Sequence, residues 1–89
     1  MPEMIPPNLR WACRRGMLEL DVLLGNFLEE AYLHVSEGDK KKFIALLNFN
    51  DQELFMWLTG KEQPSNVEVI DIVQKIRQHA KIRKHAAFL

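Results

Sequence analysis

The sequence predicts an all-α fold, a small single-domain bundle of about five short helices. Apolar residues recur at helical spacing along most of the 89 residues, and caps and glycines divide this pattern into short segments. No stretch alternates apolar and polar residues as a half-buried strand does. A chain of this length forms one domain, which we expect to span residues 1–89, with 1–7 as a flexible lead-in and 82–89 as a frayed tail.

The first helix is expected at residues 9–15, after the stiff, extended Pro6-Pro7 pair. Asn8 is a good N-cap, because its side-chain oxygen can accept amide hydrogens of the first turn. Gly16 is a natural stop, since glycine adopts the left-handed conformation without steric cost. The apolar face of this helix consists of Leu9, Ala12 and Cys13.

The second helix is expected to begin at about Met17, with apolar positions recurring as far as Val35. Gly25-Asn26 is a weak point at which this helix could bend. Glu29 and Glu30 fall on its outer face. The inward positions are Leu20, Leu23, Leu24, Phe27, Leu28, Ala31 and Val35.

The third helix is expected to follow a capping box formed by Ser36 and Asp39 and to reach about Asn48. Its three consecutive lysines, residues 40–42, are expected in solvent. The inward side chains of this helix are Phe43, Ile44, Leu46 and Leu47.

Two further helices complete the predicted bundle. Asn50 or Asp51 caps the fourth helix, which ends at Thr59-Gly60. Ser65 and Glu68 form a capping box for the fifth helix, whose apolar pattern fades beyond Lys81. Their inward positions are Leu54, Phe55, Leu58 and, in part, Trp57 in the fourth helix, and Val69, Ile70, Val73, Ile76 and Ala80 in the fifth.

Charge is balanced overall but segregated along the chain. The segment from Gly16 to Asp39 carries six acids and no lysine or arginine, whereas five bases and no acid follow from Lys75 onward. A net charge of zero argues against nucleic acid as a partner. No apolar run reaches the roughly 18 residues of a membrane span, so no membrane insertion is expected. The start of the chain does not resemble a signal peptide, and the single cysteine permits no internal disulfide, so we expect a cytoplasmic protein.

The unusual side chains are concentrated between Trp11 and Asp21, but they do not form a predicted catalytic site. Glu19 and Asp21 would point about 200° apart on a helix, so they cannot converge as an acid/base pair. Cys13 beside two arginines could have a lowered pKa, yet it falls on an apolar face, which favours a structural thiol. No cysteine and histidine combination has metal-ligand spacing, so no metal site is predicted.

A partner-binding module is the remaining interpretation. Trp11, Arg14, Arg15 and Glu19 are typical of interface hot spots, where aromatic and arginine side chains dominate. The alternative is an ordinary surface ion pair between Arg15 and Glu19 across the turn, which would contribute little. From the residues alone the two interpretations are equally supported.

The segment from Trp11 to Asp21 resembles the signature of the SdhE proteins (also called YgfY), the flavinylation and assembly factors of succinate dehydrogenase. The core of that signature is Arg-Gly-x-x-Glu, here Arg15, Gly16 and Glu19, preceded by Arg14 and followed by Leu20-Asp21. The motif alone would be weak, but the resemblance covers about residues 9 to 80. Further matching positions are Phe27, Glu30, Tyr32, Phe43, Leu46-Leu47, Asp51, Leu54-Phe55, Trp57-Leu58 and Pro64.

The resemblance implies an all-helical accessory factor with no catalytic residues of its own. Its partner would be the flavoprotein subunit of succinate dehydrogenase, and in some bacteria fumarate reductase. The factor would promote covalent attachment of FAD to that subunit while binding no flavin stably itself, and we expect it to be a monomer when free. An alternative described for the same family is an antitoxin that sequesters a protein. Residue by residue, the resemblance places Arg15, Gly16 and Glu19 at the partner interface, with Arg14, Trp11 and Asp21 as further candidates.

Overall fold

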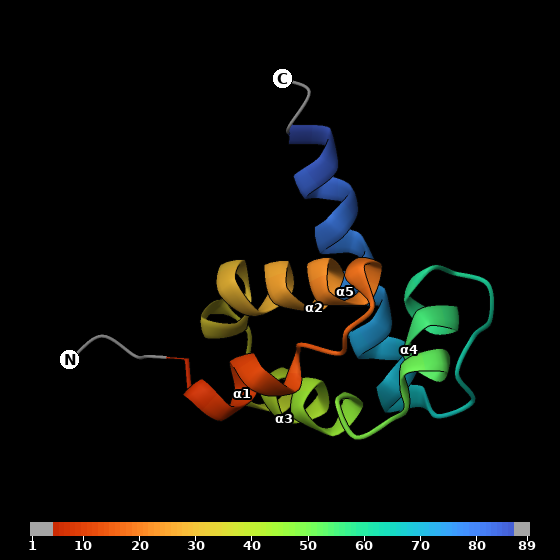
Figure 1. Ribbon diagram of the computed structural model, residues 1–89, viewed down its shortest axis with the longest axis horizontal. Helices are drawn as coiled ribbons and strands as arrows, with labels where there is room; N and C mark the ends of the chain where they lie inside the picture. The colour runs from red at the N-terminus through yellow and green to blue at the C-terminus, as the bar shows by residue number, and fades with distance from the viewer. Residues whose placement is uncertain (1–4, 87–89) are drawn as a thin grey trace.

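Five α-helices and one short 3₁₀ helix form the fold of residues 5–86, which are the residues that this computed structural model describes (Figure 1). Residues 1–4 and 87–89 lie outside the described residues. No strand occurs in residues 5–86, and the all-α prediction is confirmed. The elements in chain order are α1 (Pro7–Ala12), α2 (Leu18–Glu30), η1 (Tyr32–His34), α3 (Glu37–Leu46), α4 (Asp51–Leu58) and α5 (Val67–Ala86).

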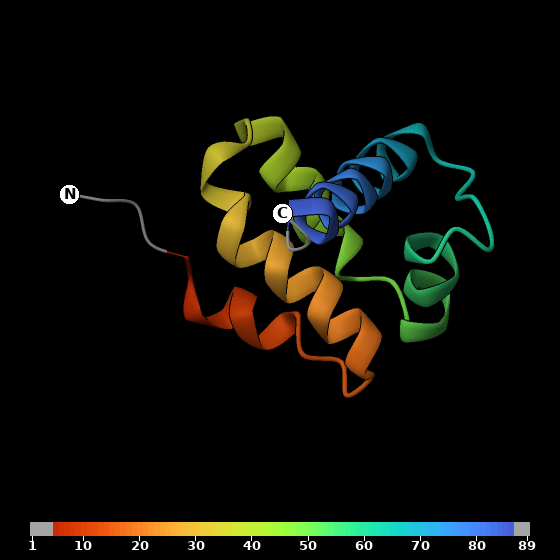
Figure 2. The ribbon, with the colours of Figure 1, turned by 90° about the horizontal axis from the view of Figure 1, so that it is seen from above.

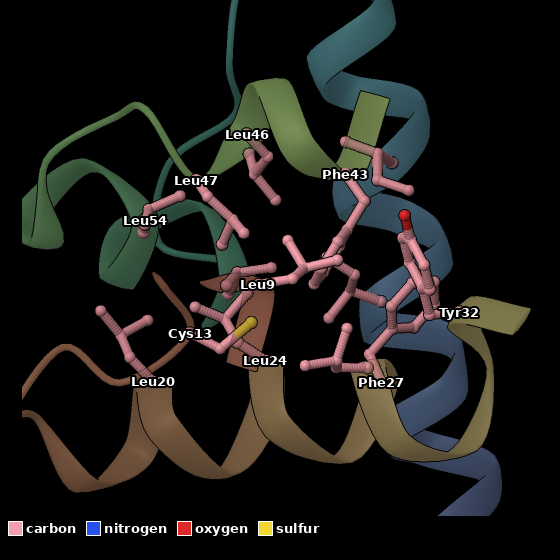
Figure 3. Close-up of a cluster of buried hydrophobic side chains, with 14 of the residues drawn as sticks. Leu9, Cys13, Leu20, Leu24, Phe27, Tyr32, Phe43, Leu46, Leu47 and Leu54 are labelled. Carbon is pink, nitrogen blue, oxygen red and sulfur yellow. The ribbon is translucent and has the colours of Figure 1, made fainter. Parts of the chain in front are cut away.

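One apolar core holds these helices together (Figure 3). α5 packs against α2, α3 and α4, and α2 also packs against α4. The rings of Phe27 on α2 and Phe43 on α3 are in contact, with 5.2 Å between their centroids. Burial of such side chains is the main stabilising contribution in a small domain. The largest fully buried side chains are Phe27, Phe43, Leu20, Leu24, Leu28, Leu46, Leu54, Ile72 and Ile76.

The first helix begins and ends earlier than the sequence predicted. Pro6 is the N-cap of α1 and Pro7 its first residue, so the prediction of Asn8 as the N-cap is wrong. Proline is favoured at the first helical position, because the amide hydrogen there has no acceptor within the helix. α1 ends at Ala12 rather than at Arg15.

The N-terminal segment contributes to the core. Leu9 and Cys13 are buried, as their spacing predicted. Ile5, which belongs to the predicted lead-in, is also buried. The apolar contacts of the chain therefore begin before α1.

The second helix is uninterrupted but shorter than predicted. α2 passes through Gly25 and Asn26 without a break and ends at Glu30, before the predicted limit at Val35. Ala31, the next residue, has a φ of −122°, which lies outside the helical range. The chain then enters the 3₁₀ turn η1, which reverses its direction toward α3.

Side-chain caps begin α3 and α4 as predicted. The hydroxyl of Ser36 accepts a hydrogen bond from the amide of Asp39 at 3.1 Å. The side-chain oxygen of Asn50 accepts one from the amide of Glu53 at 2.8 Å. Each cap satisfies one of the amide groups that a helix start leaves without an internal acceptor.

The cap of α5 differs from the prediction. The side-chain oxygen of Asn66 accepts from the amide of Glu68 at 2.8 Å, so Ser65 is not the cap. The helix begins one residue later than a Ser65 cap would require, at Val67.

The far end of α5 extends to Ala86, beyond the predicted fading at Lys81, and rises away from the other helices (Figure 1). Glu30 at the end of α2 holds this part of the helix. One oxygen of its carboxylate accepts from Nε of Arg83 at 2.9 Å, and the other lies 3.0 Å from Nε2 of His79. These polar contacts anchor the end of α5, where the apolar pattern of the sequence gives no sign of packing.

Three side chains lie differently from the prediction. Lys40 is buried, with its ammonium 5.6 Å from the centroid of the Tyr32 ring and 3.3 Å from Oε1 of Glu37. Ile44, predicted to face inward, is 46% exposed. Ile72, which was not predicted to face inward, is fully buried.

Candidate functional site

Residues 13–17 turn the chain from α1 into α2, and Gly16 lies exposed within this turn. Its φ of 82° is in the left-handed region, which glycine adopts without strain. A Cβ at Gly16 would meet no atom within 4 Å, so the backbone conformation and not crowding requires glycine within this chain. The amide of Arg15 donates to Oδ1 of Asp21 at 2.6 Å, which fastens the turn to α2. We call residues 11–19 the α1–α2 corner.

The side chain of Arg15 is directed into the protein. Its Nε donates to Oδ1 of Asp51 at 2.7 Å. Its Nη1 donates to the carbonyl oxygens of Ala12 at 3.1 Å and Leu47 at 2.9 Å. Its Nη2 donates to the carbonyl oxygen of Phe49 at 2.8 Å. Four of the five N–H donors of the guanidinium are therefore used within the chain, and the side chain is 17% exposed.

Arg15 thereby joins the ends of three helices. The carbonyl oxygens that it contacts lie at or just beyond the C-terminal ends of α1 and α3, where carbonyl groups lack helical partners and a cation is favourable. Asp51 is the first residue of α4. The alternative in which Arg15 pairs with Glu19 is wrong, because its carboxylate partner is Asp51.

The outer surface of the corner has the opposite character, since it displays apolar side chains and unpaired charges. The side chains of Arg14 and Glu19 are exposed and make no hydrogen bond or ion pair with any other residue that the structure describes. Around them lie four large apolar residues whose exposed fractions are 76% for Trp11, 37% for Met17, 80% for Leu18 and 47% for Val22. Such an exposed group of apolar side chains with charges beside it is typical of a protein-binding surface.

The six predicted partner-binding residues separate into two groups. Four of them form the exposed part of the corner, and the other two make hydrogen bonds that shape it. Sequence reasoning missed Met17, Leu18 and Val22, although a helical wheel centred on Leu20 and Leu24 places Leu18 and Val22 on the outward face of α2. The exposed group is Trp11, Arg14, Gly16 and Glu19, and the inner group is Arg15 and Asp21.

Cys13 lies in the core beneath the corner, with 3% of its surface exposed. Burial raises the pKa of its thiol to about 11, although the charge of Arg15 opposes the rise. A buried thiol that is protonated at neutral pH is neither a good nucleophile nor a good ligand. Cys13 is therefore a packing residue, as its place on the apolar face of α1 predicted.

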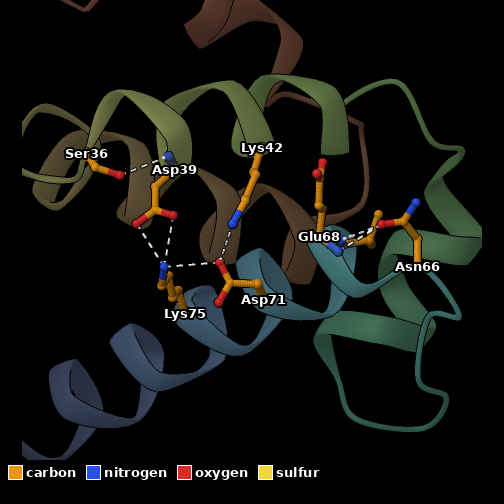
Figure 4. A network of polar contacts seen from close by, with 8 residues as sticks. Ser36, Asp39, Lys42, Asn66, Glu68, Asp71 and Lys75 are labelled. Carbon is orange, nitrogen blue, oxygen red and sulfur yellow. Dashed lines mark hydrogen bonds and ion pairs between the residues drawn. The ribbon is translucent and has the colours of Figure 1, made fainter.

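The charges of one other surface, the α3–α5 face, are paired. On the α3–α5 face (Asp39, Lys42, Asp71 and Lys75), Nζ of Lys75 lies 2.8 Å from Asp39 and 3.1 Å from Asp71, and Lys42 lies 2.9 Å from Asp71 (Figure 4). Hydrogen bonds from Lys42 and Lys75 lower the pKa of Asp71 below its usual value. Bonds to Asp39 and Asp71 raise the pKa of Lys75. Each charged side chain of this face is therefore paired with another of the same face.

Among the side chains of residues 5–83, no group of three histidine, cysteine or carboxylate side chains is placed to hold a metal ion. Among the helices that the structure describes, none combines the length and the apolar character needed to cross a membrane. The α1–α2 corner is therefore the candidate site that the geometry favours.

Comparison with known proteins shows the family of the chain. A family model described as the flavinator of succinate dehydrogenase matches residues 8–80, a range that contains the whole corner and most of the core. The chain belongs to this family. The match extends beyond the five-residue motif into α5, so it covers most of the helical framework on which the corner is built.

Individual members of the flavinator family are similar over most of their length. A protein of Shewanella oneidensis named FAD assembly factor SdhE is 47% identical over 73 residues, which cover 82% of this chain and 89% of the relative. Proteins of the same name from Colwellia psychrerythraea and Vibrio vulnificus are 47% and 43% identical over 75 and 72 residues. The Vibrio protein aligns over 81% of this chain and 84% of its own length.

Proposed function

We propose that this protein is an assembly factor that binds the flavoprotein subunit of succinate dehydrogenase and promotes covalent attachment of FAD to that subunit. It acts without catalytic residues of its own. The family match and the names of the relatives support the activity. The same surface would serve the related subunit of fumarate reductase, where the organism has one.

The observation that carries the proposal is the contrast within the motif itself. Gly16 lies exposed in the turn and Glu19 lies exposed in the first turn of α2, while Arg15 holds the corner against the ends of α1, α3 and α4. A binding surface that is rigid before contact loses less conformational entropy on association. Gly16 presents bare backbone to a partner, and Glu19 and Arg14 supply one anion and one cation for charged hydrogen bonds.

The proposed mechanism is selection of one arrangement of the flavoprotein. A factor that binds the flavinylation-competent arrangement more tightly than the others shifts the ratio of the two populations, at saturation, by the ratio of the two affinities. FAD supplies the electrophilic ring to which the flavoprotein becomes bonded, in the partner's own site. The residues of this chain would bind and orient the partner and leave the bond formation to it.

FAD is proposed to be handled on the partner and not on this protein. The four glycines stand at positions 16, 25, 38 and 60, so they form no glycine-rich loop of the kind that cradles a pyrophosphate. The exposed corner offers apolar side chains and two opposite charges, which fit a protein surface. Equilibrium dialysis of the free protein against FAD should therefore detect no stable complex.

The proposed activity is tested by reconstitution. The apo flavoprotein subunit is mixed with FAD, with and without this protein, and covalent flavin is measured by fluorescence of the subunit after denaturing electrophoresis. The factor should raise the rate of covalent attachment. An equal rate with and without the factor would overturn the proposed function.

A further inference from the structure

The outward face of α2 is apolar in its first two turns, where a surface helix is normally polar. Leu18 and Val22 are four residues apart and so lie on the same face, 80% and 47% exposed. That face lies opposite Leu20 and Leu24, which are fully buried. Exposed aliphatic side chains one helical turn apart leave apolar surface in water unless a partner covers them.

Gly25 continues this face three residues beyond Val22, in the middle of α2. A glycine within a helix lowers helix stability relative to alanine. Its φ is negative, and a Cβ built there would meet no atom within 4 Å. Neither backbone conformation nor internal packing therefore explains the missing side chain, which leaves approach by another molecule as its physical use.

Val22 and Gly25 border a groove between α1 and α2, two helices that lie side by side (Figure 2). We call it the α1–α2 groove. Val22, Gly25 and Asn26 line it from α2. Arg10 lines it from α1 and is held by an ion pair with Glu29 across the groove. Arg14 and Asp21 line the end of the groove next to the corner, so groove and corner form one continuous surface.

We propose that the α1–α2 groove seats an apolar segment of the flavoprotein subunit, in continuation of the contact at the corner. Val22 would cover an aliphatic side chain of that segment within the groove, Leu18 would extend this apolar contact toward the corner, and Gly25 would let the backbone of the segment approach α2 closely. The free charges define the flanks of the occupant: a basic group opposite Glu19 and an acidic group opposite Arg14. This inference rests on the proposed function, because it assigns the occupant to the same partner.

The test measures the dissociation constant of the isolated flavoprotein subunit for four variants by isothermal titration calorimetry. Val22→Glu places a charge in the groove and should weaken binding by at least about tenfold. Val67→Glu is the matched control, since Val67 is 78% exposed at the start of α5, outside the groove, and it should bind as the unmodified protein does. Gly16→Arg tests the contribution of the corner alone, because Gly16 does not line the groove.

Gly25→Leu separates a binding role from a structural one. Leucine is a better helix former than glycine, so this variant should melt at a higher temperature than the unmodified protein. It should nevertheless bind the subunit at least about fivefold more weakly, because its side chain fills the space kept for the partner. Greater stability combined with weaker binding is not expected of a residue that only supports the fold.

The outcomes distinguish the two proposals. If Val22→Glu and Gly25→Leu bind as tightly as the unmodified protein while Gly16→Arg does not, the groove inference is wrong and the proposed function stands. If the unmodified protein does not bind the subunit at all, the proposed function is wrong and the groove inference falls with it. Weak binding by both groove variants, with tight binding by Val67→Glu, supports both proposals.

Discussion

The α1–α2 corner and the α3–α5 face are two charged surfaces of one small fold. They differ in whether their charged side chains are paired within the chain. On the α3–α5 face every charged side chain has a partner within 3.1 Å, and the network joins two helices (Figure 4). At the corner, Glu19 and Arg14 have no partner among the described residues, and large apolar side chains surround them.

The difference shows how a chain of 89 residues divides stability from binding. Paired charges on an exposed face link elements that are distant in sequence, with modest energy. Unpaired charges beside exposed apolar groups add little to the fold but are available to a partner. Arg15 connects the two roles, because it belongs to the binding motif and yet makes its contacts inward.

The largest expected effect is loss of partner binding in Gly16→Arg. A long side chain at the exposed turn should block close approach and weaken binding of the flavoprotein subunit by about 30-fold or more, the size of a hot-spot change. Backbone strain at a φ of 82° should lower the free energy of unfolding by roughly 1–2 kcal/mol, which leaves the protein folded. Calorimetric titration and urea unfolding measure the two effects.

Gly60→Arg is the control for strain at Gly16. Gly60 has a φ of 80°, so the backbone strain is similar, but it follows α4 and lies outside the corner. A Cβ there would meet the guanidinium of Arg77 at 2.6 Å, and this flexible side chain can move. Equal loss of binding in both variants would show that strain, and not obstruction of the corner, causes the effect.

The next effect separates Arg15 from Glu19. Arg15→Met removes four hydrogen bonds and leaves three carbonyl oxygens without their donor, so the free energy of unfolding should fall by about 2–3 kcal/mol. Arg15→Lys should lower the free energy of unfolding by less, because an ammonium retains the charge and some of the hydrogen bonds. Glu19→Gln should change stability by less than about 0.5 kcal/mol yet weaken partner binding. If urea unfolding gives the same free energy of unfolding for Arg15→Met as for the unmodified protein, the inward role of Arg15 is wrong.

Cys13 should be chemically inert at neutral pH. The pKa of the thiol is about 11 against the usual 9.0, so the fraction of thiolate at pH 7.5 is lower by about 100-fold. Burial slows the reaction with a reagent further, because the reagent cannot reach the sulfur. Iodoacetamide should therefore react with the native protein far more slowly than with the urea-unfolded protein. Cys13→Ala should keep flavinylation activity, and loss of activity with an intact fold would revive a thiol mechanism.

The same pKa predicts the sign of an alkaline effect. Because the folded-state pKa of Cys13 lies above the unfolded value, its contribution to stability is complete below about pH 9 and is lost as the pH rises toward 11. The free energy of unfolding should fall over that range, and less so in Cys13→Ala. An identical fall in both proteins would show that other groups cause the loss.

The smallest effect is expected on the α3–α5 face. Asp71→Asn should lower the urea midpoint slightly, since solvent reaches the partly exposed pairs, and leave partner binding unchanged, since Asp71 lies outside the corner. The pKa of Asp71 is lowered in the folded protein, so its contribution is present at neutral pH and disappears as the pH falls below the usual value of 3.8. The difference from the unmodified protein should therefore shrink at pH 3 and in 1 M salt.

Local sequence patterns predicted most of the helices and two of the caps. Ser36 and Asn50 accept hydrogen bonds from amides three residues later in the chain, so the spacing of residues in the sequence is enough to predict these caps. The apolar spacing likewise predicted burial of Leu20, Leu24 and Phe27. These features depend on neighbours within one or two helical turns.

The features that sequence reasoning missed depend on distant partners. Arg15 bonds to residues 32 to 36 positions away, and Arg83 bonds to Glu30 over 53 positions. Burial of Lys40 beside the ring of Tyr32 depends on the turn at η1. A motif can thus identify the site without showing which of its side chains face outward.

The most direct test of the central claim, that the exposed α1–α2 corner is the partner surface, is covalent flavin on a co-expressed flavoprotein subunit. In-gel fluorescence is compared for the unmodified protein, Gly16→Arg and Asp71→Asn. Full fluorescence is predicted with the unmodified protein and with Asp71→Asn, and only the background seen without the factor is predicted with a folded Gly16→Arg. Full fluorescence with Gly16→Arg, or loss with a folded Asp71→Asn, would contradict the claim.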